Sequence, residues 1–177
     1  MSDSQAKIIR HKITRLLSRR EHSAHEIRQK LLALNNERPS FRQVAKNKSQ
    51  QQTAIDSSEL DAEAVIQPEL VDEILTQFIE KDIQSDFRYA EAVVRGAYRK
   101  GKGPLFIQRS LQEHDIDYAL VKALIAEHDF DWFELAKTVR EKRFGWELPQ
   151  DWQAKQKQMR FLQYRGFEQE QIKYAFE

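Results

Sequence analysis

The chain has 177 residues, a length that one domain can accommodate, and it contains no cysteine, which excludes disulfides, thiolate nucleophiles and thiolate-held metal centres. No stretch approaches the roughly 18 consecutive apolar residues of a membrane span, and the polar N-terminus lacks the apolar run of a signal peptide, so we expect a cytoplasmic protein. The net charge of +1 argues against a simple basic arm for nucleic acid.

The charge is unevenly distributed along the chain. Residues 1–34 carry a net +5, residues 35–70 carry −2, residues 71–131 carry −4 and residues 132–177 carry +2. Basic ends around an acidic middle suit a partner that also presents both signs of charge, such as a protein filament on DNA.

Helical periodicity dominates the first part of the chain. Apolar residues at helical spacing predict helices over 8–17 and 27–34, and Ser23 followed by Glu26 is typical of a capping box for the second. The pattern then stops at 35–67, which is rich in Gln, Asn, Ser and Lys. We interpret it as a polar insertion, either a mobile segment or a loosely held exposed helix.

Helices resume at Pro68, a favourable first-turn residue. Caps are predicted at Ser85, at Gly103 before Pro104, and at Asp117. The expected helices cover 68–79, 87–98, 104–111, 118–125, 132–144, 151–165 and 169–176. No segment is convincing as a strand, so the predicted fold class is all-α.

The helices also repeat along the chain. An offset of 80 residues aligns Ile13 with Val93 and Arg15 with Arg95, and an offset of 46 aligns Ala90 with Ala136. We therefore predict three tandem three-helix repeats at 1–81, 82–130 and 131–177, which form an elongated, curved arm. A single compact bundle is the competing arrangement.

Three motifs carry a resemblance to a known family. These are Ser18-Arg-Arg-Glu-His-Ser23, Asp86-Phe-Arg-Tyr-Ala90 followed by Gly101-Lys-Gly-Pro104, and Lys142-Arg-Phe-Gly145 followed by Arg165-Gly-Phe167. Their order and spacing resemble those of RecX proteins over 6–34 and 68–177. The insertion at 35–67 departs from the short connection usual in that family.

The resemblance implies a regulator of the RecA recombinase. Members of the family are described as lodging in the groove of the RecA filament on single-stranded DNA, where they suppress ATP hydrolysis, strand exchange and co-protease activity. On this basis we expect a monomer with no catalytic residues, cofactor or metal. The alternative is an autonomous helical DNA-binding module that acts without RecA.

Basic residues are the candidate contacts with such a partner. Arg15 and Arg19, like Arg95 and Arg99, are four residues apart and would lie on one helix face, where they could contact phosphate or an acidic protein surface. A solvated face with charges that favour the helix dipole is the alternative. The full set of candidates is Arg15, Arg19, Arg20, Arg28, Lys30, Arg95, Arg99, Lys100, Lys102, Arg109, Lys142, Arg143, Lys155, Lys157, Arg160 and Arg165.

Aromatic residues accompany the last of these cations. Phe161 and Tyr164 are interleaved with Lys157 and Arg160, a composition typical of stacking surfaces, although a core role for Phe161 is equally open. We expect the three tryptophans to be packing anchors of the third repeat; they are Trp132, Trp146 and Trp152.

Two further motifs favour structural roles over chemistry. Gly101-Lys-Gly-Pro104 lacks the phosphate-loop framework and is interpreted as a helix stop followed by a helix start. His22 and His25 lack the further ligands that a zinc site requires.

Overall fold

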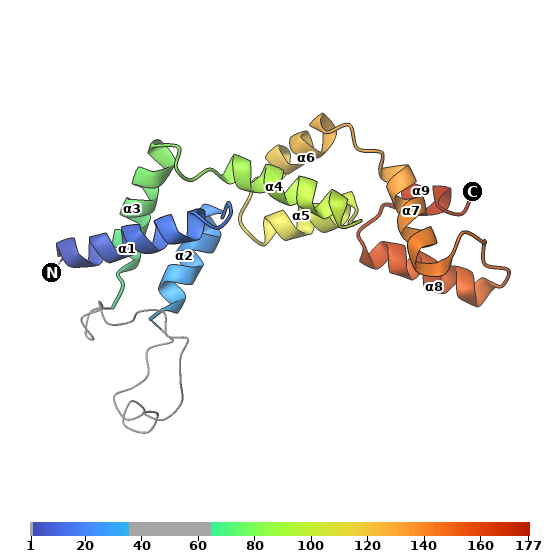
Figure 1. Cartoon of the computed structure of the whole chain (residues 1–177), viewed down its shortest axis with the longest axis horizontal. Helices are drawn as coiled ribbons and strands as arrows, with labels where there is room; N and C mark the ends of the chain where they lie inside the picture. Colours follow the sequence, from blue (N-terminus) through green and yellow to red (C-terminus); the bar gives the residue numbers. More distant parts are fainter. Residues whose placement is uncertain (1, 36–64) are drawn as a thin grey trace, which may run out of the picture. The chain divides into compact units, whose positions relative to one another are not determined.

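The computed structural model describes residues 2–35 and 65–177, within which nine helices and no strand are found. The chain divides into two compact units, residues 1–85 (unit 1) and residues 86–177 (unit 2), and each is described by itself. Figure 1 shows the order of the helices along the chain. The all-α fold class is confirmed, whereas the curved arm and the repeat boundaries at 81 and 130 stay predictions.

Unit 1 contains three helices around one apolar core: α1 (Ser2–Leu17), α2 (Ala24–Ala33) and α3 (Pro68–Glu80). Ile9 and Ile13 of α1 pack with Ile27 of α2 and Ile74 of α3, and all four are almost fully buried. The Ser23 side chain accepts a hydrogen bond from the Glu26 backbone amide, as predicted.

The ends of the predicted insertion at 35–67 meet in unit 1. The Asn35 side-chain amide donates to the Ile66 carbonyl at 3.0 Å, and the Ile66 amide donates to the Asn35 side-chain oxygen at 2.9 Å. Ile66 itself is buried in the core. Both ends of the segment are thus attached to the helical core, while residues 36–64 lie outside the described part of the chain.

Unit 2 contains two successive three-helix groups, each with its own core. The first is α4 (Asp86–Arg99), α5 (Pro104–Gln112) and α6 (Tyr118–Glu127). The second is α7 (Trp132–Phe144), α8 (Trp152–Tyr164) and α9 (Gln169–Tyr174). The bounds of α7 match the prediction, and α8 and α9 end within one or two residues of it.

The predicted caps in unit 2 are confirmed at two positions. Gly103 is the N-cap of α5 with Pro104 in its first turn, and the Asp117 side chain accepts the amide of Leu120 at the start of α6. Gly101, with φ of +66°, follows the end of α4 in the left-handed region that favours glycine. The Gly101-Lys-Gly-Pro104 motif therefore ends one helix and starts the next, as predicted.

The same motif also joins the two groups of unit 2, which the sequence did not predict. The Gly103 amide donates to the Arg165 carbonyl at 2.9 Å, and the Leu105 amide donates to the Gly166 carbonyl at 3.0 Å. A Cβ atom on Gly103 would lie 2.3 Å from the Gly166 carbonyl oxygen, so the approach requires glycine. The turn after α8 is thus hydrogen-bonded to the start of α5.

The expectation that all three tryptophans are packing anchors is wrong for two of them. Trp132 packs against the core of the first group, but Trp146 and Trp152 are 78% and 69% exposed. A buried arginine holds the loop before α8 instead. The Arg140 guanidinium donates to the carbonyls of Glu147 at 3.2 Å and Trp146 at 3.3 Å, so the loop needs no aromatic anchor.

Candidate functional site

A groove rich in positive charge lies within unit 2, where the end of α4 meets α7 and α8. It has a volume of about 330 Å³, and we call it the basic groove. Five of its ten lining residues are cationic and none is acidic. The lining residues are Arg99, Lys100, Gly101, Leu135, Thr138, Val139, Lys142, Arg143, Phe161 and Arg165.

Each cation of the basic groove stands at the carboxyl end of a helix. Arg99 ends α4 and is followed by Lys100, Lys142 and Arg143 are in the last turn of α7, and Arg165 is the C-cap of α8. A helix carboxyl end carries partial negative charge, which favours cations there by about 0.3–1 kcal/mol each. The helix ends therefore support a concentration of like charge in one place.

Arg165 has a structural role in addition to its charge. Its guanidinium donates to the Lys100 carbonyl at 2.9 Å and lies over the Phe161 ring at 5.2 Å. It thereby satisfies a carbonyl at the end of α4 and bridges the two groups of unit 2. Burial, followed by repulsion from Arg165, lowers the pKa of the neighbouring Lys102, whose ammonium lies over the Phe106 ring at 4.3 Å.

The other cations of the basic groove are available to a partner. Lys142 and Arg143 are solvent-exposed, as are Arg99 and Lys100, and none of the four forms an ion pair with another described residue. Helix ends favour these cations, but no carboxylate of the described chain pairs with them. A polyanion or an acidic protein surface would supply the opposite charge.

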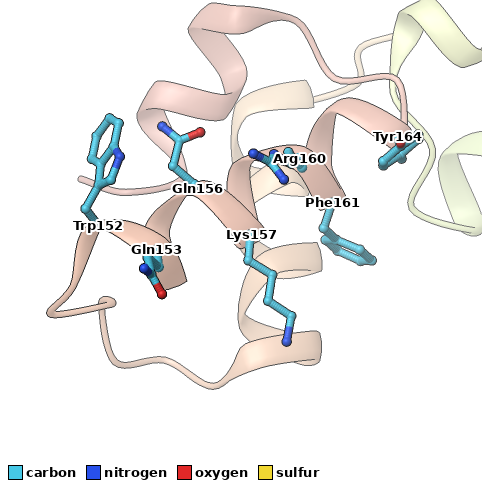
Figure 2. Close-up of a pocket in the computed structure, with 7 residues that line it drawn as sticks. All are labelled: Trp152, Gln153, Gln156, Lys157, Arg160, Phe161 and Tyr164. Atoms are coloured by element: carbon cyan, nitrogen blue, oxygen red, sulfur yellow. The ribbon is translucent and has the colours of Figure 1, made fainter.

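A second groove, of about 520 Å³, follows one exposed face of α8, which we call the α8 face. Figure 2 shows its side chains along the helix, with Trp152 at one end and Tyr164 at the other. Lys157 and Arg160 lie between these aromatic residues, and Tyr164 is 87% exposed. Phe161 lines both grooves and packs edge-on against Phe144 at 5.3 Å.

Several of the predicted contact residues form ion pairs inside the protein. Arg20 and Lys30 both bind the Glu26 carboxylate, at 2.5 Å and 3.0 Å. Arg28 pairs with Asp72 at 2.7 Å in unit 1, and Arg95 pairs with Glu91 in unit 2. Binding a partner through these side chains would compete with an existing pair, which makes them weaker candidates than the cations of the basic groove.

The remaining candidates line neither groove. Arg15 and Arg19 are exposed at the end of α1 and form no ion pair with a described residue, while Arg109 is exposed on α5. Lys155 is on α8, but its ammonium lies over the Phe176 ring at 5.6 Å and outside the α8 face. Arg95 and Arg99, which were predicted to act together, have different surroundings. Arg99 lines the basic groove, whereas Arg95 pairs with Glu91.

Sequence reasoning missed how residues far apart in the chain converge. Three uncharged lining residues of the basic groove come from α7, namely Leu135, Thr138 and Val139, while two of its cations come from the end of α4. The available signal was the pair of glycines, Gly103 and Gly166, since glycine at two turns permits close backbone approach.

No titratable group is arranged for metal binding among the described residues. His22 is buried, and burial lowers the pKa of its imidazole, whose Nδ1 lies 2.9 Å from the Arg20 carbonyl oxygen. None of the helices in residues 2–35 and 65–177 combines the length and apolar character that would let it cross a membrane.

Family models and individual relatives with similar sequences both point to one family. Residues 85–125 match the model of the second three-helix domain of RecX, and residues 129–176 match that of the third. Regulatory protein RecX of Serratia proteamaculans is 36% identical over 158 residues, which cover 89% of each chain. The protein of the same name from Yersinia enterocolitica is 33% identical over the same shares, and that of Acinetobacter baylyi is 39% identical over 64% of this chain and 66% of its own. The chain belongs to the RecX family of regulatory proteins.

Proposed function

We propose that the protein is a cytoplasmic, monomeric negative regulator of the RecA recombinase that binds in the groove of the RecA filament on single-stranded DNA. The identity of the partner rests on the resemblance to RecX proteins and on membership of that family. The observation that carries the mode of binding is the basic groove, with five cations and no acidic residue among its lining. The regulation requires no catalytic group, cofactor or metal.

The mechanism follows from the charge of the basic groove. Its exposed cations bind phosphates or acidic surfaces of the filament, and the helices behind them occupy the filament groove. A ligand seated there hinders the rearrangement between filament subunits that ATP hydrolysis and strand exchange require. Because exposed charges dominate the contact, its affinity falls as salt rises.

The test is DNA-dependent ATP hydrolysis by RecA, together with strand exchange, in a titration with the protein. We expect both activities to fall as the protein is added. The double variant Lys142→Ala, Arg143→Ala removes two exposed cations of the basic groove and should need at least about 10-fold more protein for the same inhibition, if each lost contact is worth about 0.7 kcal/mol or more.

The matched control removes two exposed cations of unit 2 that line neither groove, through Lys122→Ala and Lys173→Ala. It changes the net charge equally and should inhibit like the parent protein. Hydrolysis and strand exchange that stay unchanged at saturating protein would refute the regulatory proposal. Equal loss of inhibition in both double variants would refute the role of the basic groove.

The second candidate function is an autonomous DNA-binding module, which the basic groove also favours. This candidate predicts tight binding to bare DNA with a steep dependence on salt, in the absence of RecA. Feeble binding to bare DNA at physiological salt, combined with retained binding to the filament, would exclude it.

A further inference from the structure

The α8 face presents aromatic rings to solvent that the core of unit 2 does not use. The last three helices already have a closed core, in which Leu162 and Ile172 are fully buried and Phe167 nearly so. Trp152 and Tyr164, by contrast, are 69% and 87% exposed. Large exposed aromatic side chains beside a groove are typical of a binding surface.

The residues of the α8 face form two rows with four-residue spacing, so each row runs along one side of the helix. The first row is Trp152, Gln156, Arg160 and Tyr164, and the second is Gln153, Lys157 and Phe161. Successive members of a row are about 6 Å apart along the helix axis. Each row has a cation in its interior and an aromatic residue at its end, with no acidic residue in either.

The chemistry of these rows selects the class of ligand. Exposed rings can stack on unpaired bases, and the amide groups of glutamine can donate to and accept from base edges. Lys157 and Arg160 supply the charge that phosphates require. A double helix would keep its bases stacked on one another and unavailable to Trp152 and Tyr164, so a single strand fits this face better.

The α8 face also continues into the basic groove. Phe161 lines both, and Arg165 of the basic groove lies over its ring at 5.2 Å. A strand that stacks along α8 would therefore pass directly to the five cations of the basic groove. This continuity supplies phosphate contacts beyond the two cations of the face itself.

We propose that the α8 face binds single-stranded nucleic acid, with Trp152 and Tyr164 stacking on bases and Lys157 and Arg160 contacting phosphates. The binding needs no RecA, and it extends the function proposed above by assigning the nucleic-acid contacts of the protein to a defined face. A protein partner on the same face is the other class of occupant, and the experiment separates the two.

The experiment measures the affinity of the full-length protein for a labelled oligothymidylate of about 15 nucleotides by fluorescence anisotropy. Trp152→Ala and Tyr164→Ala should each weaken binding by about 5- to 100-fold, because loss of one stacked base has that effect. Trp152→Phe should restore most of the affinity. Trp146→Ala is the matched control, since Trp146 is 78% exposed but lines neither groove, and it should bind like the parent protein.

The salt dependence separates stacking from charge. The slope of log affinity against log salt should be unchanged in Trp152→Ala and should become shallower by about 0.7 in each of Lys157→Gln and Arg160→Gln. An affinity of Trp152→Ala, Tyr164→Ala equal to that of Trp146→Ala would overturn the proposal. So would a parent protein that binds no oligothymidylate, or aromatic variants that lose only filament binding, which would indicate a protein partner.

Measuring the inhibition of RecA by the same variants distinguishes the proposed regulatory function from the proposed binding of single strands by the α8 face. A protein that binds the oligothymidylate through the α8 face without inhibiting RecA would refute the regulatory function alone. A protein that inhibits RecA with unaltered affinity in the aromatic variants would refute the α8 proposal alone.

Discussion

The contact between Gly103 and Gly166 makes a quantitative prediction about stability. In Gly103→Ala the new Cβ would lie 2.3 Å from the Gly166 carbonyl oxygen and 2.6 Å from the Phe167 amide nitrogen. Both atoms belong to the backbone, so they cannot move aside as a flexible side chain would. The turn after α8 must therefore separate from the start of α5.

The expected cost comes from the hydrogen bonds that hold this turn. Separation breaks the bond from the Gly103 amide to the Arg165 carbonyl and that from the Leu105 amide to the Gly166 carbonyl. At about 0.5–1.5 kcal/mol net each, their loss destabilises unit 2 by about 1–3 kcal/mol. The poorer N-cap of alanine and the lower entropy of its unfolded chain are each about 0.5–1 kcal/mol and opposite in sign, so they roughly cancel.

Gly96→Ala is the matched control, because it makes the same chemical change inside α4. A Cβ on Gly96 meets no atom within 4 Å outside the backbone of its own helix. Alanine is the better helix former by about 1 kcal/mol, so this variant should be more stable than the parent protein. The two substitutions are thus expected to have opposite signs.

Urea unfolding followed by tryptophan fluorescence measures the effect in unit 2 alone, since all three tryptophans lie at or after position 132. Trp132 reports the loss of tertiary packing, because it contacts the rings of Tyr98 and Phe130. A Gly103→Ala protein as stable as the parent would refute the stabilising role assigned to this contact. A Gly96→Ala protein destabilised by the same amount would refute the steric reasoning.

Three further predictions concern charged side chains. Arg140→Ala removes the buried donor to three loop carbonyls, so it should lower the free energy of unfolding by at least about 2 kcal/mol. It should also make the loop before α8 more sensitive to protease, and unchanged proteolysis would contradict this prediction. Burial raises the pKa of the Glu26 carboxyl, but hydrogen bonds from Arg20 and Lys30 outweigh this effect and hold the pKa below the ordinary value of a glutamate. The stability that Glu26 contributes should therefore be complete above about pH 4.5 and be lost as the pH falls through the lowered pKa, and an NMR titration that finds a raised pKa would contradict it. Arg28→Ala should leave the midpoint of thermal unfolding nearly unchanged, because its ion pair with Asp72 is exposed to solvent and screened by it. A clear drop in the midpoint would show that the pair is more than a simple surface contact.

Local signals in the sequence predicted the helices well. Caps such as Ser23 and Asp117 act through hydrogen bonds to residues three positions away, so the sequence alone contains both partners. Apolar spacing predicted the buried positions for the same reason, since one helix turn brings residues three and four apart to one face. Ile13 and Ile27, which defined the first two helices, are fully buried.

Contacts between distant segments could not be predicted in this way. Lys100 and Lys142 line the same groove although they are far apart in the sequence. The hydrogen bond from Arg165 to the Lys100 carbonyl links α8 to the end of α4, and no local pattern in the sequence indicates it. Trp152 was expected in the core because large aromatic residues usually stabilise small helical units, but Arg140 holds the adjacent loop and leaves Trp152 at the surface. The ion pair of Arg28 with Asp72 joins residues 44 positions apart, so the spacing of residues along one helix could not predict it.

Co-sedimentation with RecA filaments on single-stranded DNA, at physiological salt, tests the central claim most directly. The parent protein and the Lys122→Ala, Lys173→Ala control should pellet with the filament, whereas Lys142→Ala, Arg143→Ala should stay largely in the supernatant. A parent protein that remains in the supernatant, or a Lys142→Ala, Arg143→Ala protein that pellets as the parent does, would contradict binding of the filament through the basic groove.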